Sequence, residues 1–381
     1  MSPYSLLQTH LNMNFDTLRN AAYRRAIVAA VGQDSVVLDL GAGLGVLGFL
    51  AARAGARKVY LVEPERVILL TEKIRKINRL ENAECIRATA ETLRLPEKAD
   101  IILSVFTGNF LLTEDLLPSL FWARDRFLAP GGTLIPDRGR MMVAPVSAPA
   151  YYQEKVDRWA LSGPQNENLQ RFGIEYPDLR AYVVNSLFYE SAEKLHAQLL
   201  AEPACLLDLD FMTAQSADCD TGAELAVAES GVCHGWLGWF ETRLGSEWLT
   251  TAPDADRTHW RPVFMPLDSP LQLSRGQSVT FRLKRPEYGE WTWATEADGL
   301  VQTQSTFLSQ PMTPGSLQKR SDGYTPSISE KGEAMQFVLS RFDGGTSVAT
   351  IADALMDRFS GTFPTRREAL NFVKSLVSEA D

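Results

Sequence analysis

The sequence predicts an α/β protein with a doubly wound parallel sheet, then a β barrel with a helical arm, then a small winged-helix-like domain. Three observations support this fold class. Apolar strand-like runs alternate with helical segments between residues 35 and 145, as in doubly wound sheets. Short stretches with a period of two follow after residue 200, which is typical of barrels and sandwiches. The last fifty residues show three short segments of helical periodicity.

We expect four regions that differ in composition and periodicity. They are an N-terminal helical lid (1–34), the α/β domain (35–145), the barrel (146–302) with its arm at about 155–200, and a linker with the C-terminal domain (303–381). Within the α/β domain the expected elements are, in order, strand 36–39, helix 46–54, strand 58–62, helix 66–80, strands 85–87 and 100–104, helix 114–128 and strand 133–136. The stretch from 151 to 200 is expected to be mostly helical, with breaks at Gly163-Pro164 and Tyr176-Pro177.

The composition limits the classes of partner. The 381 residues carry a net charge of −9 with a pI near 5.2, which argues against nucleic-acid binding through bulk electrostatics. No apolar run approaches the length of a membrane span, and the N-terminus lacks the pattern of a signal peptide. The four cysteines are scattered without a CxxC pair, so we expect reduced thiols, a cytoplasmic protein and no metal site.

The most informative stretch is the glycine-rich turn after the first strand. Asp39 ends an apolar run, and Gly41, Gly43 and Gly45 follow before a helix begins. Glycines let the backbone turn sharply and lie against a ligand, which the free N–H groups at the helix start then face. Glu63 ends the second strand, where an acid can accept hydrogen bonds from ribose hydroxyls. This pattern predicts a site for a nucleotide cofactor.

The choice of cofactor rests on spacing and charge. The G-x-G-x-G spacing departs from the G-x-G-x-x-G of dinucleotide sites. Asp39, just before the turn, can bind the amino group of a methionine moiety, whereas it would repel a pyrophosphate. S-adenosylmethionine (AdoMet) is therefore favoured over NAD.

Several separated motifs, taken in order, resemble the protein arginine methyltransferase family over roughly residues 10–300. They are the glycine loop, the acidic strand end, the loop 104–114, the barrel and Thr258-His259-Trp260. By this resemblance Arg19 would hold the AdoMet carboxylate, and Met13 would lie near the methyl group. The segment 171–176 occupies the place of the family's dimerisation arm, which implies a head-to-tail homodimer. The resemblance further implies cofactor contacts from Asp39, Gly41, Gly43, Glu63, Ala90 and Glu91, the last of these at the adenine.

The loop 104–114 departs from the family pattern. The family carries two glutamates that grip a guanidinium, and here Glu114 matches the second while Val105 stands in the place of the first. Because a guanidinium favours bidentate carboxylate pairing, arginine fits this slot less well. A neutral imidazole needs only one carboxylate for its ring N–H, and its other nitrogen can attack the methyl carbon. Histidine is therefore the favoured target, while asparagine, lysine and a less well gripped arginine stay open.

The resemblance also assigns residues around this slot. It pairs His259 with Asp16 as catalytic residues, a pair that would close the lid over AdoMet and could pass a proton to solvent. Trp260 would form a wall of the substrate slot, and Phe106 and Asn109 are further candidate slot residues. The other histidines have no partner pattern and are expected to be structural: His10, His196 and His234.

The C-terminal residues 315–381 resemble a second family, the PqqD-like domains, which capture the leader of a ribosomally made precursor peptide. Capture is expected by β-augmentation onto an edge strand from residues 310–330. A winged-helix DNA binder is the rival interpretation, but residues 331–381 carry six Lys/Arg and seven Asp/Glu and so lack a basic face. The matching stretches are 328–334, 342–347 and 351–359.

Together, these features predict an AdoMet-dependent enzyme that N-methylates a side chain, histidine in preference, of a precursor peptide held by the C-terminal domain. A protein or peptide arginine methyltransferase is the main alternative within the same chemistry. A catalytically silent relative that serves as a peptide-binding scaffold is the alternative from another functional class.

Overall fold

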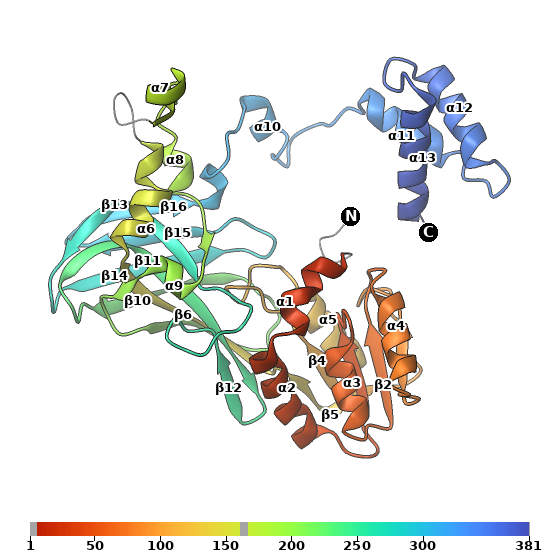
Figure 1. Ribbon diagram of the computed structural model, residues 1–381, viewed down its shortest axis with the longest axis horizontal. Coiled ribbons are helices and arrows are strands. Elements are labelled where there is room, and N and C mark those ends of the chain that lie inside the picture. Colours follow the sequence, from red (N-terminus) through yellow and green to blue (C-terminus); the bar gives the residue numbers. More distant parts are fainter. Residues whose placement is uncertain (1–5, 161–166, 381) are drawn as a thin grey trace. The chain divides into compact units, whose positions relative to one another are not determined.

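The computed structural model describes residues 6–160 and 167–380 (Figure 1). The chain separates into two compact units, Met1–Pro311 and Met312–Asp381. The sequence placed this boundary near residue 302, but a barrel strand continues to Ser305 and pairs with its neighbour. The larger unit therefore takes in the first part of the expected linker.

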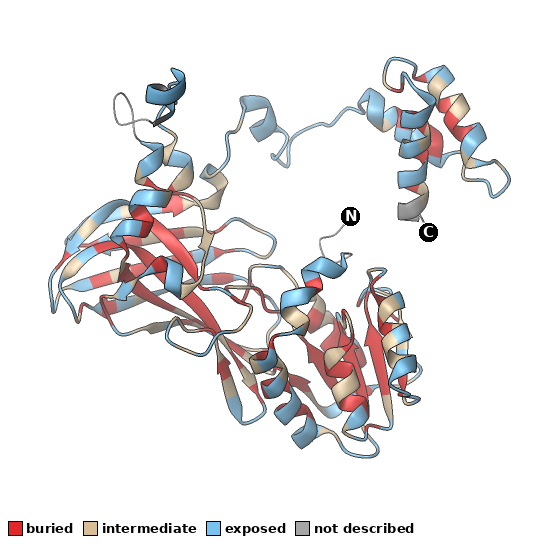
Figure 2. Ribbon diagram, in the orientation of Figure 1, coloured by how far each residue is buried: buried red, intermediate tan, exposed pale blue. Residues whose placement is uncertain are grey.

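A five-stranded parallel sheet forms the α/β part, as expected. Its strand order is β3-β2-β1-β4-β5, and each neighbouring pair is parallel. The strands of the centre are nearly all buried (Figure 2), since their side chains are Val, Leu and Ile on both faces. The strands are β1 (Val36–Leu40), β2 (Lys58–Val62), β3 (Ala83–Ile86), β4 (Ala99–Ser104) and β5 (Leu128–Ile135). The helices between them are α3 (Val46–Arg53), α4 (Ile68–Ile77) and α5 (Leu117–Phe127).

The N-terminal segment is helical and packs against the α/β sheet's first helix. It consists of η2 (Leu7–His10), α1 (Leu11–Asn14) and α2 (Thr17–Ala30). Asp16 is the N-cap of α2 and accepts a hydrogen bond from the Arg19 N–H at 2.9 Å, which satisfies one of the free donors of the first turn. Tyr23 and Ile27 are fully buried on the inner face of α2.

The second part of the larger unit is built from antiparallel strands in two sheets. One sheet has the order β10-β14-β15-β16, and the other runs β7-β13-β11-β6-β8, with β12 on β11 and β9 on β6. The period-two stretches of the sequence form strands here. The bounds are β6 (Arg138–Ser147), β7 (Phe188–Tyr189), β8 (Gln198–Leu199), β9 (Ala204–Asp210), β10 (Cys219–Ala226), β11 (Gly231–Leu244), β12 (Glu247–Thr250), β13 (Val263–Leu273), β14 (Ser278–Arg285), β15 (Thr292–Ala297) and β16 (Leu300–Ser305), followed by η5 (Thr306–Leu308).

The expected arm is less helical than its periodicity suggested. Short helices alternate with the two-residue strands β7 and β8, which attach the segment to the antiparallel sheet. The expected break at Gly163-Pro164 lies outside the described residues. The helices are α6 (Pro149–Lys155), η3 (Asp157–Trp159), α7 (Glu167–Phe172), α8 (Arg180–Val183) and α9 (Ala192–Leu195).

The smaller unit is a bundle of helices around its own apolar core. Its members are α10 (Pro314–Gln318), α11 (Glu330–Leu339), α12 (Val348–Arg358) and α13 (Arg366–Ala380), and the core includes Phe337, Leu355 and Val373. Residues 312–380 contain no strand, so the expected edge strand and the wing do not form. The segment 319–329 is polar and contains Pro326, which cannot donate to a strand ladder.

The structure also bears on membrane insertion. Across residues 6–160 and 167–380, none of the helices combines the length and the apolar character that crossing a bilayer requires.

Candidate active site

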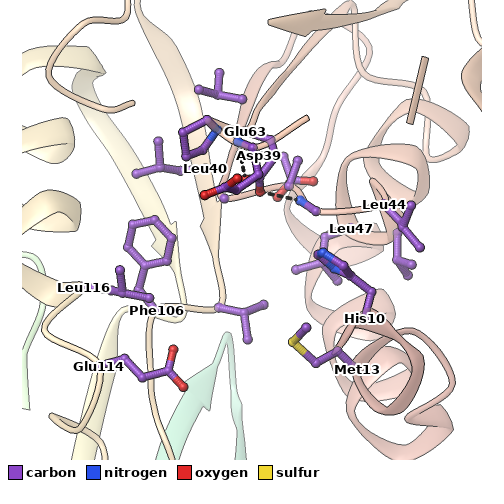
Figure 3. Close-up of a pocket in the computed structure, with 18 of the residues that line it drawn as sticks. His10, Met13, Asp39, Leu40, Leu44, Leu47, Glu63, Phe106, Glu114 and Leu116 are labelled. Carbon is purple, nitrogen blue, oxygen red and sulfur yellow. Dashed lines mark hydrogen bonds between the residues drawn. The ribbon is translucent and has the colours of Figure 1, made fainter. Parts of the chain in front are cut away.

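A cavity of about 390 Å³ opens at the carboxyl ends of β1, β2 and β4, beneath the N-terminal helices (Figure 3). Ligands of open α/β sheets bind at this edge of the sheet, and the volume lies within the range of small-molecule sites. Most of the residues expected to bind cofactor or substrate line it. They are Met13, Arg19, Asp39, Gly41, Gly43, Glu63, Ala90, Glu91, Val105, Phe106, Glu114, His259 and Trp260.

The glycine loop and Glu63 form one hydrogen-bonded unit. The Gly43 N–H donates to Oε2 of Glu63 at 3.0 Å, and the Glu65 N–H donates to Oε1 at 3.0 Å. Gly43 has φ of +54°, a left-handed conformation that favours glycine. Burial raises the pKa of Glu63. Each of its oxygens keeps a free lone-pair direction, so the carboxylate can still accept from the two hydroxyls of a ribose.

Asp39 is the most deeply buried acid of the cavity. Only 2% of the residue is exposed, and its Oδ2 accepts the Gly48 N–H at 2.7 Å. Burial, together with the nearby charge of Glu63, raises the pKa of Asp39 to about 7. A buried carboxylate of this kind is stabilised by a cationic ligand group, such as the ammonium of a methionine moiety.

Arg19 brings a buried positive charge to the same cavity. Its guanidinium is held in place by the Asn20 side-chain oxygen, which accepts from Nε at 3.1 Å and from Nη2 at 2.8 Å. Burial lowers the pKa of Arg19, and the charges of Asp16 and Asp39 act in the opposite direction. Arg19 and Asp39 thus bring a cation and an anion to the same cavity, and the two charges complement the carboxylate and the ammonium of an amino-acid ligand.

His259 and Asp16 are joined as the resemblance implied. The Asp16 Oδ2 accepts the backbone N–H of His259 at 2.8 Å and also lies 2.8 Å from its Nδ1. Burial raises the pKa of Asp16, but the bonds from His259 and Arg19 outweigh it and hold the pKa below its usual value. Because Asp16 is then ionised and cannot donate, the proton between the two atoms belongs to Nδ1 of His259. This pair links the N-terminal helices to the loop before β13.

One part of the cavity, the candidate substrate slot, is lined by aromatic and apolar groups around the Glu114 carboxylate. Figure 3 places Glu114 and Met13 on opposite sides of the cavity, with Phe106 beside Glu114. The Trp260 Nε1 donates to the Thr107 carbonyl at 3.1 Å, and its ring lies 4.2 Å from the ring of His259. These contacts fix the Trp260 ring as one wall of the site.

Two expectations about individual residues differ from the structure. Asn109 is absent from the cavity lining; its side-chain oxygen instead accepts the Arg261 N–H at 2.8 Å and braces the loop. His10, which we expected to be purely structural, lines the cavity and is only 4% exposed. A Cβ built on Gly43 would lie 3.2 Å from the His10 Nδ1. The one signal for His10 was its position three residues before Met13, on the same helical face.

Thr71 is a site residue that sequence reasoning missed. Its Oγ1 donates to the Gly43 carbonyl at 2.6 Å and so fixes the glycine turn from α4. Nothing in the local pattern of α4 distinguishes this threonine from a surface residue, because the contact crosses from one helix to a distant loop.

Two family models match the chain over adjoining ranges. Residues 37–132 match a methyltransferase domain, and residues 137–290 match the arginine methyltransferase oligomerization subdomain. Both ranges end before the smaller unit begins.

Relatives and solved structures agree with these models. A probable histone-arginine methyltransferase CARM1 of Oryza sativa subsp. indica is 31% identical over 330 residues, which cover 80% of this chain. The chain spans only 62% of that relative's length. The histone-arginine methyltransferase CARMER of Drosophila persimilis is 29% identical over 392 residues, covering 93% of this chain and 71% of the relative.

The fold is shared with solved enzymes of the same type. The Trypanosoma brucei PRMT1 enzyme–prozyme complex with AdoHcy superposes with a TM-score of 0.70 at 28% identity, covering 80% of this chain and 99% of that one. Arabidopsis thaliana protein arginine methyltransferase 10 gives 0.68 at 25% identity with the same coverage. The chain is therefore similar to protein arginine methyltransferases over about four fifths of its length, and it is a methyltransferase whose cofactor is S-adenosylmethionine.

Proposed function

We propose that this protein N-methylates a histidine side chain of a peptide, using AdoMet, and that residues 312–381 recruit that peptide. The observation that carries the proposal is that Val105, rather than a second carboxylate, lines the same cavity as Glu114 at the candidate substrate slot. The named relatives are histone-arginine methyltransferases, so arginine is the competing target.

The charges of the cavity fit AdoMet. Arg19 would pair with its carboxylate, Asp39 with its ammonium and Glu63 with the ribose hydroxyls. Met13 lies across the cavity from Glu114, which is where the family resemblance puts the methyl group (Figure 3). When bound, AdoMet supplies a methyl group activated by the sulfonium charge.

The chain's own groups suit a neutral imidazole. Glu114 would accept the N–H of one ring nitrogen, which orients the other nitrogen's lone pair toward the methyl carbon. As the new N–C bond forms, the ring gains a positive charge that Glu114 stabilises. Val105 and Phe106 would contact the apolar carbon edges of the ring. A guanidinium would leave donors facing Val105 without an acceptor, and such unpaired donors are costly in a buried slot.

The His259–Asp16 pair would complete the reaction by taking up a proton. Asp16 fixes Nδ1–H of His259, so its Nε2 is available as the acceptor. His259 also lines a second, outer cavity of about 730 Å³, which adjoins Asp16 and Arg257. This arrangement would let the proton lost from the product imidazolium reach solvent.

The smaller unit is proposed to hold the peptide's leader. Exposed apolar side chains lie along α11 and just before it, at Ile328, Met335 and Leu339. Because residues 312–380 contain no strand, a peptide would dock along this apolar face and the segment 325–328 before it, rather than onto an existing sheet. Covalent attachment to the catalytic unit raises the effective concentration of a weakly bound target residue.

The oligomerization subdomain is proposed to form a homodimer through the arm. Its exposed side chains include Trp159, Phe172 and Ile174, which a partner copy would cover. Light scattering should therefore give the mass of a dimer for the full chain, and a monomer at micromolar concentration would contradict this assignment.

A catalytically silent scaffold is disfavoured by the groups that remain. Glu114 lines the cavity, and the His259–Asp16 pair is intact. Neither arrangement would be needed for peptide binding alone.

Release of S-adenosylhomocysteine from the full chain tests the chemistry directly. With a short histidine peptide at saturating AdoMet, the rate should rise with pH through the titration of free imidazole, near pH 6.5, and then level off. Glu114→Gln should lower kcat by about a hundredfold, since it removes the charge that stabilises the imidazolium. Glu229→Gln is a matched control, because Glu229 is exposed and lies outside the cavity lining. Equal turnover by wild type and Glu114→Gln would contradict the proposal.

A further inference from the structure

The residue after the proposed catalytic glutamate adopts an unusual backbone conformation. Asp115 has φ of +53°, and Leu111, three residues before Glu114, has φ of +48°. Non-glycine residues occupy this left-handed region rarely, and they stay there only when surrounding contacts determine the conformation. The position of Glu114 between them therefore depends on whatever holds the two ends of the segment 110–115.

A single loop of the barrel supplies contacts at the Asp115 end. The Arg285 Nη2 forms an ion pair with Oδ1 of Asp115 at 2.5 Å, and the Tyr288 N–H donates to the same oxygen at 2.8 Å. Arg285 is the last residue of β14, and Tyr288 lies in the turn before β15. Asp115 is thus held by the connection between two adjacent strands.

The same loop also holds the other end of the segment. The Phe110 ring stacks on the Trp291 ring with centroids 5.5 Å apart and an interplanar angle of 29°. The Arg285 guanidinium lies over Trp291, 5.1 Å from the ring centroid. Arg285 therefore contacts the partner of Phe110 as well as Asp115, and it ties both ends of the segment to one rigid strand end.

Arg285 is almost completely buried, unlike an arginine in a surface ion pair. Its side chain is 3% exposed, and its Nε and Nη1 have no hydrogen-bond partner within the described structure. Asp115 is therefore its principal anchor. Tyr189 lies near both Arg285 and Glu114. Burial raises the pKa of the Tyr189 phenol, and the charge of Arg285 lowers this pKa while the charge of Glu114 raises it. The cation thus sits close enough to the catalytic segment to act on its geometry.

We infer that Arg285 is a positioning residue for Glu114, acting through Asp115 and Trp291. The inference rests on the proposed function of Glu114 and extends it to the barrel, where the family motifs assign no role to this arginine. Displacement of a catalytic group by about 1 Å costs on the order of a hundredfold in rate. Loss of the clamp should therefore reduce turnover without reducing cofactor binding.

The test compares Arg285→Met with Arg282→Met, a control on the same strand whose side chain is exposed. Hydrogen exchange of the full chain should become at least tenfold faster at residues 110–116 in Arg285→Met, and stay unchanged at the glycine loop 41–45. The AdoMet dissociation constant should stay within about twofold of wild type, while kcat for a histidine peptide falls by about ten- to a hundredfold. Arg285→Lys should recover part of kcat, because it keeps the charge at Asp115.

Asp115→Asn is a second variant for the same test, since it removes the charge of the less buried partner of the Arg285–Asp115 ion pair. Its effect on kcat should not add to that of Arg285→Met, as expected for two residues that act as one unit. Unchanged exchange at 110–116 in both variants would overturn the inference, and so would faster exchange throughout the larger unit with weaker AdoMet binding. Faster exchange confined to 110–116 with unchanged kcat would uphold the positioning contact and count instead against the catalytic role of Glu114.

Discussion

The Asp16–His259 pair gives the sharpest prediction about cofactor binding. Asp16 accepts three hydrogen bonds, from the Arg19 N–H and from two donors of His259, and its side chain is 3% exposed. In Asp16→Asn one oxygen becomes an NH₂ group that faces a donor. At least one bond to a charged acceptor is lost, and such bonds contribute about 1.5–3 kcal/mol each.

This loss of free energy should destabilise the position in which the N-terminal helices hold Met13 and Arg19 in the cavity. A loss of about 2–3 kcal/mol corresponds to an AdoMet dissociation constant roughly 30- to 150-fold higher, which isothermal titration calorimetry can measure. Glu247→Gln is the matched control, because it breaks the exposed Arg25–Glu247 pair between α2 and β12. That variant should change the constant by less than about threefold.

The pH dependence of the same pair follows from the lowered pKa of Asp16. A group whose pKa is depressed by folding contributes stability above its unfolded pKa of 3.8 and loses that contribution as the pH falls through the folded value. The contribution of Asp16 should therefore be constant from pH 5 to 8 and fade only in acid. Wild-type AdoMet affinity in Asp16→Asn would refute the reasoning that this pair closes the cofactor site.

Three further predictions concern the cofactor loop and the smaller unit. Because folding raises the pKa of Asp39 to about 7, the protein without AdoMet should become less stable as the pH rises from about 4 to 7. AdoMet affinity should rise between pH 6 and 7, since binding favours the ionised carboxylate and releases its proton. Asp39→Asn should abolish this pH dependence of the affinity, as measured by calorimetry. Gly43→Ala should weaken AdoMet binding at least tenfold because its Cβ meets His10, whereas Gly55→Ala, with a positive φ but open space, should not. Removal of residues 312–381 should leave methylation of a short peptide intact and lower kcat/KM for a leader-bearing precursor by about a hundredfold, whereas equal loss on both substrates would exclude leader capture.

Much of the cofactor site was predictable because its signals are local. Asp39, the glycine loop and Glu63 lie within 25 residues and follow from the strand–turn–helix pattern alone. The pairing of Asp16 with His259 spans 243 positions and was accessible only through the family resemblance. His10 and Thr71 were missed because their contacts with Gly43 arise from packing between distant elements.

In the C-terminal unit the helices were predictable from local sequence, but the absence of a strand was not. Helical periodicity predicted three helices in the last fifty residues, and the structure has α11 to α13 there, since their apolar faces repeat within each segment. The prediction of an edge strand was wrong because a strand needs a partner strand, and residues 312–380 offer none to the segment around Pro326. Likewise, the shape of the arm depends on β7 and β8 pairing with distant strands, which local periodicity does not reveal.

In the proposed function, a slot with one carboxylate selects imidazole over guanidinium. The direct test is tandem mass spectrometry of two peptides, identical except for histidine or arginine at one position, that compete for the full chain and AdoMet. We predict that wild type places the methyl group on histidine, and that Val105→Glu shifts the product toward arginine, while Val105→Leu does not. A methyl group mapped to arginine in the wild-type reaction would contradict the proposed selection of imidazole by this slot.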